Sequence, residues 1–305
     1  MLIYTLKRLG VALLVAFAVS MITFTLLRFS GDPAAAMAGE AATEEDISYI
    51  RKHYGFDRPL PEQYAKWLGN ALQGDFGNSI YLKVPVAGVI AEKAPVTMKL
   101  GAFALTFALV LAIPLGVLAA IRPNSIFDRV ALTIAVVGQA LPSFFFALIM
   151  IIFFGVTMRW LPISGSASWK NFIMPSIALG YYATPAIMRL TRAGMLDVLA
   201  SDYIRTARAK GLRPGVVLFK HALRNAIIPV VSLSAVQLGF MLGGSIVIET
   251  IFSLNGLGNL AWLSIQRSDF EMMQAIVLSV ATFYILLTFL ADLLNAFLDP
   301  RIRVG

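Results

Sequence analysis

The densest run of cationic residues lies between Ser201 and Pro229, in the segment SDYIRTARAKGLRPGVVLFKHALRNAIIP. Its only acid is Asp202, and its basic residues are Arg205, Arg208, Lys210, Arg213, Lys220 and Arg224. So many cations cannot lie within hydrocarbon, because each charge at the centre of a bilayer costs at least about 2.5 kcal/mol. The segment is therefore expected to protrude into water, where it is a candidate surface for binding a partner.

The spacing within this segment predicts a helix, a turn and a second helix. Ser201 or Asp202 can cap the first helix, Gly211 can end it in a left-handed turn, and Pro214 suits the first turn of the second. Pro229 then opens the next apolar run.

On a helical wheel, Ile204, Ala207, Arg208 and Gly211 share one side of the first helix. A bilayer surface would need a broad apolar face. A short helix with small residues on one side and cations around it instead favours a socket in a partner protein. The alternative is a positively charged cytoplasmic loop that only fixes the topology of the chain.

The composition indicates the kind of protein to which this basic segment belongs. Of 305 residues, 58% are hydrophobic and 14% charged, and the mean hydropathy is +0.78. We therefore expect an all-α, polytopic membrane protein rather than a soluble globule. The net charge of +8 does not indicate nucleic-acid binding, because the basic residues sit in short loops beside apolar runs. The lack of cysteine excludes disulfides, zinc–thiolate sites and iron–sulfur clusters.

The apolar runs predict six transmembrane helices. Their expected bounds are Val11–Leu27, Leu100–Ile121, Val130–Met158, Phe172–Leu190, Pro229–Ile251 and Met272–Phe297. The two short outer loops have only Arg159, Lys170 and Arg267, whereas the inner segments, including Arg301 and Arg303 after Asp299, are rich in Lys and Arg. This bias places both termini in the cytoplasm.

Three parts of the chain follow from these spans. Residues 1–30 form the N-terminus and the first transmembrane helix, residues 31–98 a small helical and loop-rich outer-face domain, and residues 99–305 a five-helix core with a cytoplasmic loop at 193–228. Within the outer domain we expect helices at Thr43–Tyr54 and Pro61–Leu72, the first capped by Thr43 and the second begun at a proline.

Polar residues within the apolar runs are candidates for a translocation path or gate. Gln139 and Ser143 flank Pro142, and either line a wet path or bond to a neighbouring helix. The glycine-rich stretch after them in the chain, FMLGGSIVIETIFSLNGLGNLAWLSI, favours a broken helix or re-entrant loop, although its glycines also suit close helix packing. The candidates in that stretch are Met241, Ser245, Glu249 and Asn255.

Glu249 is placed near the outer end of the fifth span, with no basic residue close to it along the run. A carboxylate there must be neutral, hydrated or paired. A partner would come from another helix, the outer loop, backbone amides of the turn Ser253–Gly258 or another chain. We expect Glu249 to hold this turn as an external gate, with contact to the transported solute as the alternative.

Four segments of the sequence resemble a known family. FSGDPA, GFDRPLPEQYAKWLGNALQGDFGNSI, DYIRTARAKGL and HALRNAIIP resemble the first permease subunit of ABC importers for dipeptides, oligopeptides, nickel and glutathione. In such permeases a short cytoplasmic helix ending at a glycine docks into a cleft of the ATPase subunit. The matching positions here are Tyr203, Ile204, Arg205, Thr206, Ala207, Arg208, Lys210, Gly211 and Leu212.

This chain departs from that family pattern at two places. The pattern has an acid and two alanines before the glycine, whereas this chain keeps Ala207, Gly211 and Pro229 but has Arg205 and Thr206 at the first two places. The resemblance implies a bacterial inner-membrane location and, as partners, a second permease chain, two ATPase subunits and an outer-face binding protein. ATP and Mg²⁺ would be bound by the ATPase subunits, and this chain would bind no cofactor.

Several sequence patterns are absent. The chain has no phosphate-binding P-loop, no Gly-x-Ser-x-Gly elbow and no HExxH pair, so neither ATP hydrolysis nor an intramembrane enzyme is indicated. Two alternatives to an ATP-driven permease remain. One is an ion-coupled secondary transporter, which would use Glu249 and Asp292 as a relay. The other is a structural or assembly subunit.

The predicted topology can be tested with single cysteines, because the native chain has no competing thiol. Cysteines at Ser48 and Ser166 should react with an impermeant thiol reagent in intact cells, whereas a cysteine at Ser201 should react only after the cells are opened. Labelling at Ser201 before Ser48 would reverse the orientation.

Overall fold

Four helices of the computed structural model are long and apolar enough to cross a membrane. They are α1 (Leu2–Ser30), α5 (Val86–Ile121), α12 (Ile228–Ile251) and α14 (Phe270–Leu298). The structure describes residues 2–39 and 41–298, so Asp299, Arg301 and Arg303 lie outside the described residues. The described chain is built of helices and loops, which confirms the predicted all-α class.

The shorter elements connect these four helices. They are α2 (Pro33–Ala38), α3 (Glu44–Tyr54), α4 (Leu60–Leu72), α6 (Ile126–Ala140), α7 (Ser143–Met150), a π-helix (Ile151–Thr157), a 3₁₀ turn (Trp169–Phe172), α8 (Ile173–Gly180), α9 (Thr184–Leu199), α10 (Asp202–Ala209), a second π-helix (Val216–Leu223), α11 (Arg224–Ala226) and α13 (Leu257–Gln266). The predicted outer helices correspond to α3 and α4, and Thr43 caps α3 in a capping box with Asp46.

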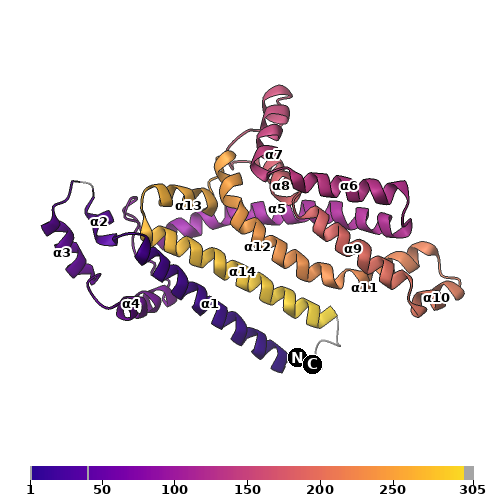
Figure 1. Cartoon of the computed structure of the whole chain (residues 1–305), viewed down its shortest axis with the longest axis horizontal. Coiled ribbons are helices and arrows are strands. Elements are labelled where there is room, and N and C mark those ends of the chain that lie inside the picture. Colours follow the sequence, from indigo (N-terminus) through magenta and orange to yellow (C-terminus); the bar gives the residue numbers. More distant parts are fainter. Residues whose placement is uncertain (1, 40, 299–305) are drawn as a thin grey trace.

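The third and fourth predicted spans are not continuous helices. The third is divided at Leu141–Pro142 into α6 and α7, and α7 projects from the side of the bundle (Figure 1). The fourth is divided at residues 181–183 into α8 and α9. Proline explains the first break, because it lacks an N–H and disfavours helical backbone at the residue before it. At the second break, Pro185 lies in the first turn of α9, where proline is tolerated.

The second predicted span is longer than expected. Helix α5 begins at Val86, so residues 86–98, which the sequence assigned to the outer domain, are the first turns of this helix. Its face toward α8 and α9 has small buried residues one turn apart, Ala104, Ala108, Ala112 and Gly116. A Cβ on Gly116 would lie 2.7 Å from the Met188 carbonyl oxygen, so the helices approach closely at this point.

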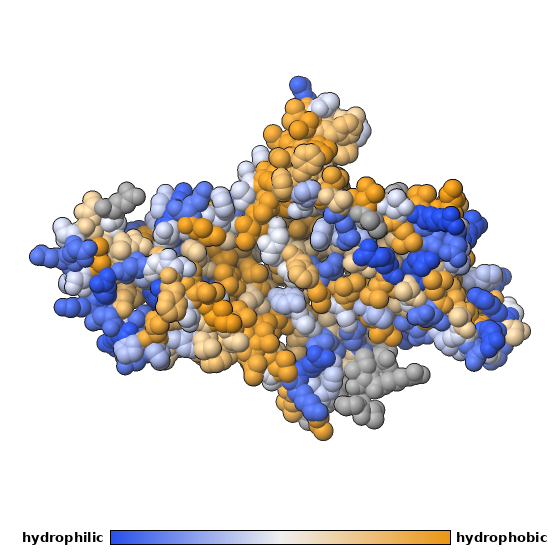
Figure 2. Space-filling model, in the orientation of Figure 1, coloured by the Kyte–Doolittle hydropathy of each residue, from blue (hydrophilic) through white to orange (hydrophobic). Residues whose placement is uncertain are grey.

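The two polar parts of the chain lie at opposite ends of the molecule. Figure 1 shows α2–α4 at one end and α10 at the other, with the long helices between them. Figure 2 shows hydrophilic residues gathered at both ends and hydrophobic residues over the middle and over the projecting α7. Helix α1 packs along α14, and Arg8 pairs with Asp292 at 3.1 Å near the start of α1 and the end of α14.

The carboxylate of Asp269 fixes the outer loop to the start of α14. It accepts hydrogen bonds from the Ser79 hydroxyl and from the backbone N–H groups of Ile80 at 3.1 Å and Met272 at 3.4 Å. The Arg267 guanidinium lies over the Tyr81 ring, 3.7 Å from its centroid. The outer domain is thus joined to the turn between α13 and α14.

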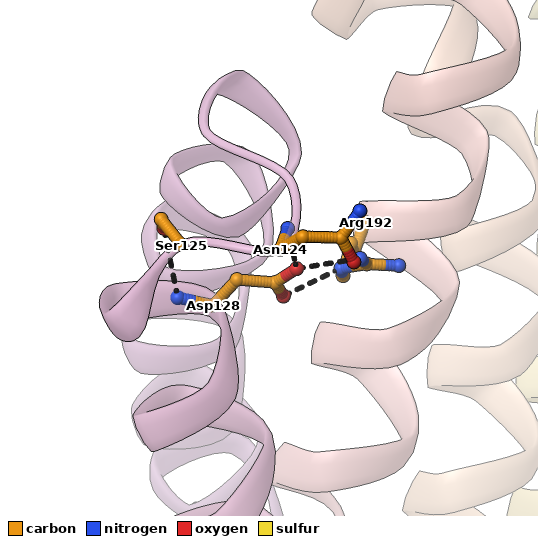
Figure 3. Close-up of polar contacts among 4 residues, drawn as sticks. All are labelled: Asn124, Ser125, Asp128 and Arg192. Atoms are coloured by element: carbon orange, nitrogen blue, oxygen red, sulfur yellow. Dashed lines mark hydrogen bonds and ion pairs between the residues drawn. The ribbon is translucent and has the colours of Figure 1, made fainter.

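At the opposite end, Asp128 fixes the start of α6 to α9 (Figure 3). Its carboxylate is 2% exposed and accepts Arg192 Nε at 2.7 Å and Nη2 at 2.6 Å, a bidentate pair. It also accepts the backbone N–H of Asn124 at 2.9 Å. The hydrogen bonds from Arg192 hold the pKa of the Asp128 carboxyl below its ordinary value, although burial acts in the opposite direction.

Replacing Asp128 by Asn should reduce the free energy of unfolding by about 1–3 kcal/mol, because the partly buried guanidinium of Arg192 loses its charged hydrogen bonds. Since the folded-state pKa is lowered, the contribution is present above the ordinary aspartate pKa and is lost as the pH falls through the lowered one. The difference between wild type and Asp128→Asn should therefore be largest near neutral pH and shrink in acid.

Thermal or denaturant unfolding of the purified chain in detergent over a pH series measures this difference. Glu92→Gln is the control, because the Glu92 side chain, paired with Lys93, is 71% exposed and should change stability by less than about 0.5 kcal/mol. Equal, pH-independent effects of the two substitutions would contradict the assigned role of Asp128.

Candidate functional site

A cavity of about 580 Å³ lies where the two broken helices meet α12. Three of the predicted pathway residues, Gln139, Ser143 and Met241, line it together. Phe240 and Gln237 of α12 also line it, and Phe240 is 72% exposed. We call this space the pathway cavity. Gln139 and Met241 are 102 positions apart in the sequence (241 − 139), and the breaks in the two spans bring them together.

Side chains near each helix break donate hydrogen bonds to backbone carbonyls at the other break. The Tyr181 hydroxyl donates to the Leu141 carbonyl, and Gln139 Nε2 donates to the Tyr182 carbonyl at 3.3 Å. The sequence left open whether Gln139 lines a wet path or bonds to a neighbouring helix. In the structure its amide bonds to the turn between α8 and α9, and the residue also lines the cavity. Carbonyls freed by a helix break at membrane depth need such donors, since each unsatisfied group there costs several kcal/mol.

The other predicted pathway residues lie outside the pathway cavity. Ser245 lines a second, largely apolar pocket of about 400 Å³ between α12 and α14, and its hydroxyl donates to the Leu242 carbonyl at 2.8 Å. Asn255 is exposed in the turn after α12. Glu249 is fully buried. The six candidates therefore divide into a cavity group and a group near the end of α12.

The Glu249 carboxylate binds the first turn of α13. Oε1 accepts the Thr97 hydroxyl at 2.8 Å, and Oε2 accepts the Asn259 backbone N–H at 3.0 Å. The Thr97 oxygen in turn accepts the Leu257 N–H at 2.8 Å. Unpaired N–H groups at a helix start favour a negative charge, so Glu249 and Thr97 together supply the N-terminal cap that α13 lacks from its own Gly256.

Glycine is required twice in this turn. A Cβ on Gly256 would collide with the Glu249 carboxylate and the Thr97 hydroxyl, and one on Gly258 would lie 2.8 Å from the Ile246 Cα. The glycine-rich stretch thus lets α13 approach α12 closely enough for the carboxylate to reach its amides. The sequence named another helix and the amides of the turn Ser253–Gly258 among the possible partners of Glu249. The donors are Thr97 of α5 and Asn259, which lies one residue beyond that turn, and the sequence singled out neither residue.

Helix α10 and Gly211 form the predicted coupling segment. Gly211 has φ of +74°, the left-handed conformation expected for it. Ser201 precedes the helix, but its hydroxyl donates to the Val198 carbonyl at 2.6 Å instead of capping α10. Six of the predicted coupling residues have side chains exposed to solvent: Tyr203, Arg205, Thr206, Arg208, Lys210 and Leu212.

Two of the predicted coupling residues face the chain's own core. Ile204 is fully buried and Ala207 is 7% exposed, and both pack with Val117 of α5, Met195 of α9 and Val217. Their surfaces are not available to a partner, so they hold α10 in place while its opposite face is presented. Tyr203 links this face to α11, since its hydroxyl accepts Asn225 Nδ2 at 2.8 Å.

Comparisons with known proteins identify the family. Residues 112–304 match the binding-protein-dependent transport system inner membrane component, and residues 1–101 match the N-terminal part of such membrane components. The chain is 40% identical over 304 residues to the glutathione transport system permease protein GsiC of Escherichia coli (strain K12), and equally to that of Shigella flexneri serotype 5b (strain 8401), covering 99% of each chain.

The fold is also similar to that of a solved transporter. The inward-facing MetNI methionine ABC transporter matches with a TM-score of 0.59 and 20% identity, over 69% of this chain and 96% of that chain. The helical pattern, the full-length identity and this likeness of fold agree. The chain belongs to the family of ABC-importer inner-membrane permeases and is a multi-pass subunit of such a transporter.

Proposed function

We propose that this chain forms half of the translocation pathway for a peptide-type solute that an external binding protein delivers. The proposal is carried by one arrangement: a cavity between broken helices, with the exposed basic face of α10 at one end of the molecule and the outer domain at the other. The 40% identity to a glutathione transport permease supports a peptide cargo. An ion-coupled carrier or a purely structural subunit does not fit membership of the ABC-importer family.

The remaining subunits follow from this proposal. A second, homologous permease chain completes the pathway, and two ATPase subunits bind ATP and Mg²⁺ and hydrolyse the ATP. The α10 end faces the cytoplasm, because its cluster of Arg and Lys obeys the positive-inside bias. Both termini are placed on that side, because α1 begins and α14 ends at the ends that lie away from α2 and α3 (Figure 1). The outer domain then faces the binding protein.

The coupling role of α10 rests on its exposed face and on the turn that ends it. Gly211 has no atom within 4 Å of where a Cβ would stand, so a side chain there meets open space and only the backbone conformation is strained. Asparagine tolerates a positive φ, whereas a β-branched residue does not. Comparing Gly211→Asn with Gly211→Val therefore isolates the conformation of the turn.

In proteoliposomes with the co-purified ATPase, permease and binding-protein partners, the wild-type chain should support ATP-dependent uptake of glutathione or a dipeptide. Gly211→Val should reduce uptake and substrate-stimulated ATP hydrolysis at least about fivefold, from a strain of about 1–3 kcal/mol, while Gly211→Asn stays near wild type. Uptake without ATP, driven by an ion gradient, would contradict the function. Equal activity of both variants would contradict docking through this turn.

The Glu249 contacts support a gate that holds α13 rather than a direct contact with solute, because the carboxylate has no exposed surface. Glu249→Gln can keep both contacts: its oxygen accepts the Asn259 N–H, and its amide donates to Thr97. Glu249→Ala leaves buried donors without a partner, at about 1–3 kcal/mol each. Thr97→Val removes the bridging hydroxyl without touching the carboxylate.

We expect Glu249→Gln to transport, whereas Glu249→Ala and Thr97→Val hydrolyse ATP with reduced uptake for every cargo tested. The measurement is the ratio of solute transported to ATP hydrolysed in proteoliposomes. If Glu249 instead contacts solute, both Glu249 variants should alter cargo preference and Thr97→Val should stay coupled. If Glu249→Ala and Thr97→Val each transport as much solute per ATP hydrolysed as the wild type, Glu249 does not act as a gate.

A further inference from the structure

Gln237 lies within α12 and lines the pathway cavity. It is nine residues after Ile228, the first residue of the helix (237 − 228). At 1.5 Å per residue it is roughly 14 Å along the axis, near the middle of a hydrocarbon layer about 30 Å thick. The sequence did not single out this residue. It nevertheless places an uncharged amide deep in the membrane-spanning part of the chain.

The Gln237 amide has no hydrogen-bond partner among the described residues. It is not sealed inside the protein, because the side chain is partly exposed and neither of its polar atoms is fully buried without a partner. Gln139, the other glutamine of the cavity, instead uses its Nε2 to bond to the Tyr182 carbonyl at 3.3 Å. An accessible amide at membrane depth must bond to water, to a solute or to another chain.

Two hydroxyl groups in the same cavity share this property. Ser143 begins α7 and Tyr182 lies between α8 and α9, and both line the cavity. Ser143 is partly exposed and Tyr182 is 55% exposed, and neither hydroxyl has a hydrogen-bond partner in the described part of the chain. Three elements thus each bring one uncommitted, accessible polar group to one space. This convergence is typical of a site that orients a small molecule.

The chemistry of the cavity wall indicates which part of a solute these groups contact. Every described residue that lines the cavity is apolar or an uncharged polar residue, so this chain offers no counter-ion there to the charged ends of a peptide. A glutamine side chain is itself an amide, with a carbonyl acceptor beside an NH₂ donor. Gln237 can therefore accept a hydrogen bond from a peptide N–H and donate one to a peptide carbonyl, while the apolar wall contacts the hydrocarbon parts of the solute.

Resting on the proposed function, we propose that Gln237 contacts the peptide group of the solute as it passes through the pathway cavity. The passing peptide group replaces water at the amide, so neither partner is left unpaired during the exchange. A solute without the peptide N–H leaves the glutamine oxygen without that donor and is transported less well. Because the contact is to the backbone amide, Gln237 selects for peptide bonds rather than for particular side chains.

The test combines a change in the solute with a change in the chain. The solutes are alanyl-alanine and alanyl-lactate, in which an ester oxygen replaces the peptide N–H. Initial ATP-dependent uptake rates are measured in proteoliposomes with the co-purified partners and saturating binding protein. The measured quantity is the rate for alanyl-alanine divided by that for alanyl-lactate. The binding protein and the ATPase are the same in every sample, so a change in this ratio reports the permease chain.

Gln237→Leu should lower the ratio about threefold to tenfold, because it removes a hydrogen bond that only alanyl-alanine can make. Gln266→Leu is the matched control. Gln266 is an exposed glutamine at the end of α13 that does not line the pathway cavity, and its variant should keep the wild-type ratio. Co-purification of the partner subunits and gel filtration of each variant separate a lost contact from a failure to assemble.

A single cysteine provides a second measurement, because the native chain has no thiol. In Gln237→Cys the thiol should react with a small water-soluble methanethiosulfonate. With binding protein and ATP present throughout, alanyl-alanine should slow this reaction at least threefold. This measurement decides the question if uptake of alanyl-lactate is too slow to detect.

Other outcomes overturn the proposal. If Gln237→Leu lowers uptake of both solutes by the same factor, the amide bonds to another chain or serves packing. A reaction rate in Gln237→Cys that alanyl-alanine does not change places the solute away from this residue. Absence of ATP-dependent alanyl-alanine uptake by the wild-type chain overturns the proposed function together with this contact. Normal uptake with an unchanged ratio in Gln237→Leu removes the contact alone.

Discussion

The close approach of α5 to α8 and α9 is the constraint on which the rest of the molecule depends. Small residues recur one turn apart along α5, and Gly180 of α8 meets the backbone of Ala104 with no room for a Cβ. In lipid, helices associate through such packing and through hydrogen bonds, since burial of apolar surface gains little there. The approach fixes α9, and α9 then sets the positions of Arg192 and α10.

Buried acids at the chain's turns satisfy polar backbone that the helices leave unpaired. Glu249 binds the amides that begin α13, Asp269 binds those of the outer loop, and Asp128 binds the Asn124 amide together with Arg192. A single hydrogen bond contributes only about 0.5–1.5 kcal/mol net, whereas a buried donor without a partner costs about 1–3 kcal/mol. The main effect of these acids is therefore to avoid unpaired groups, which explains why each has several donors.

Features set by neighbouring residues could be predicted from the sequence, and features set by distant ones could not. The Thr43 cap and the left-handed Gly211 depend on contacts within a few residues. Thr97 lies 152 residues from Glu249, and no local pattern marks the pair. Pro142 is visible in the sequence between Gln139 and Ser143, but the donor that permits a full break there, the Tyr181 hydroxyl, belongs to another element. The inward direction of Ala207 was missed because a wheel gives the side of a helix, not its neighbours.

Helix α5 connects the two candidate functional regions directly. Near its outer end Thr97 bonds to the Glu249 turn, and near its inner end Val117 and Ala120 pack with Ile204 and Ala207 of α10. At 1.5 Å per residue these contacts lie roughly 30 Å apart along one helix. A displacement of α10 that preserves its packing must move the inner end of α5, and the outer end carries one of the two groups that cap α13. The described contacts thus form a continuous packed connection between α10 and the turn before α13, with Pro95 and Pro114 as the places where α5 can bend.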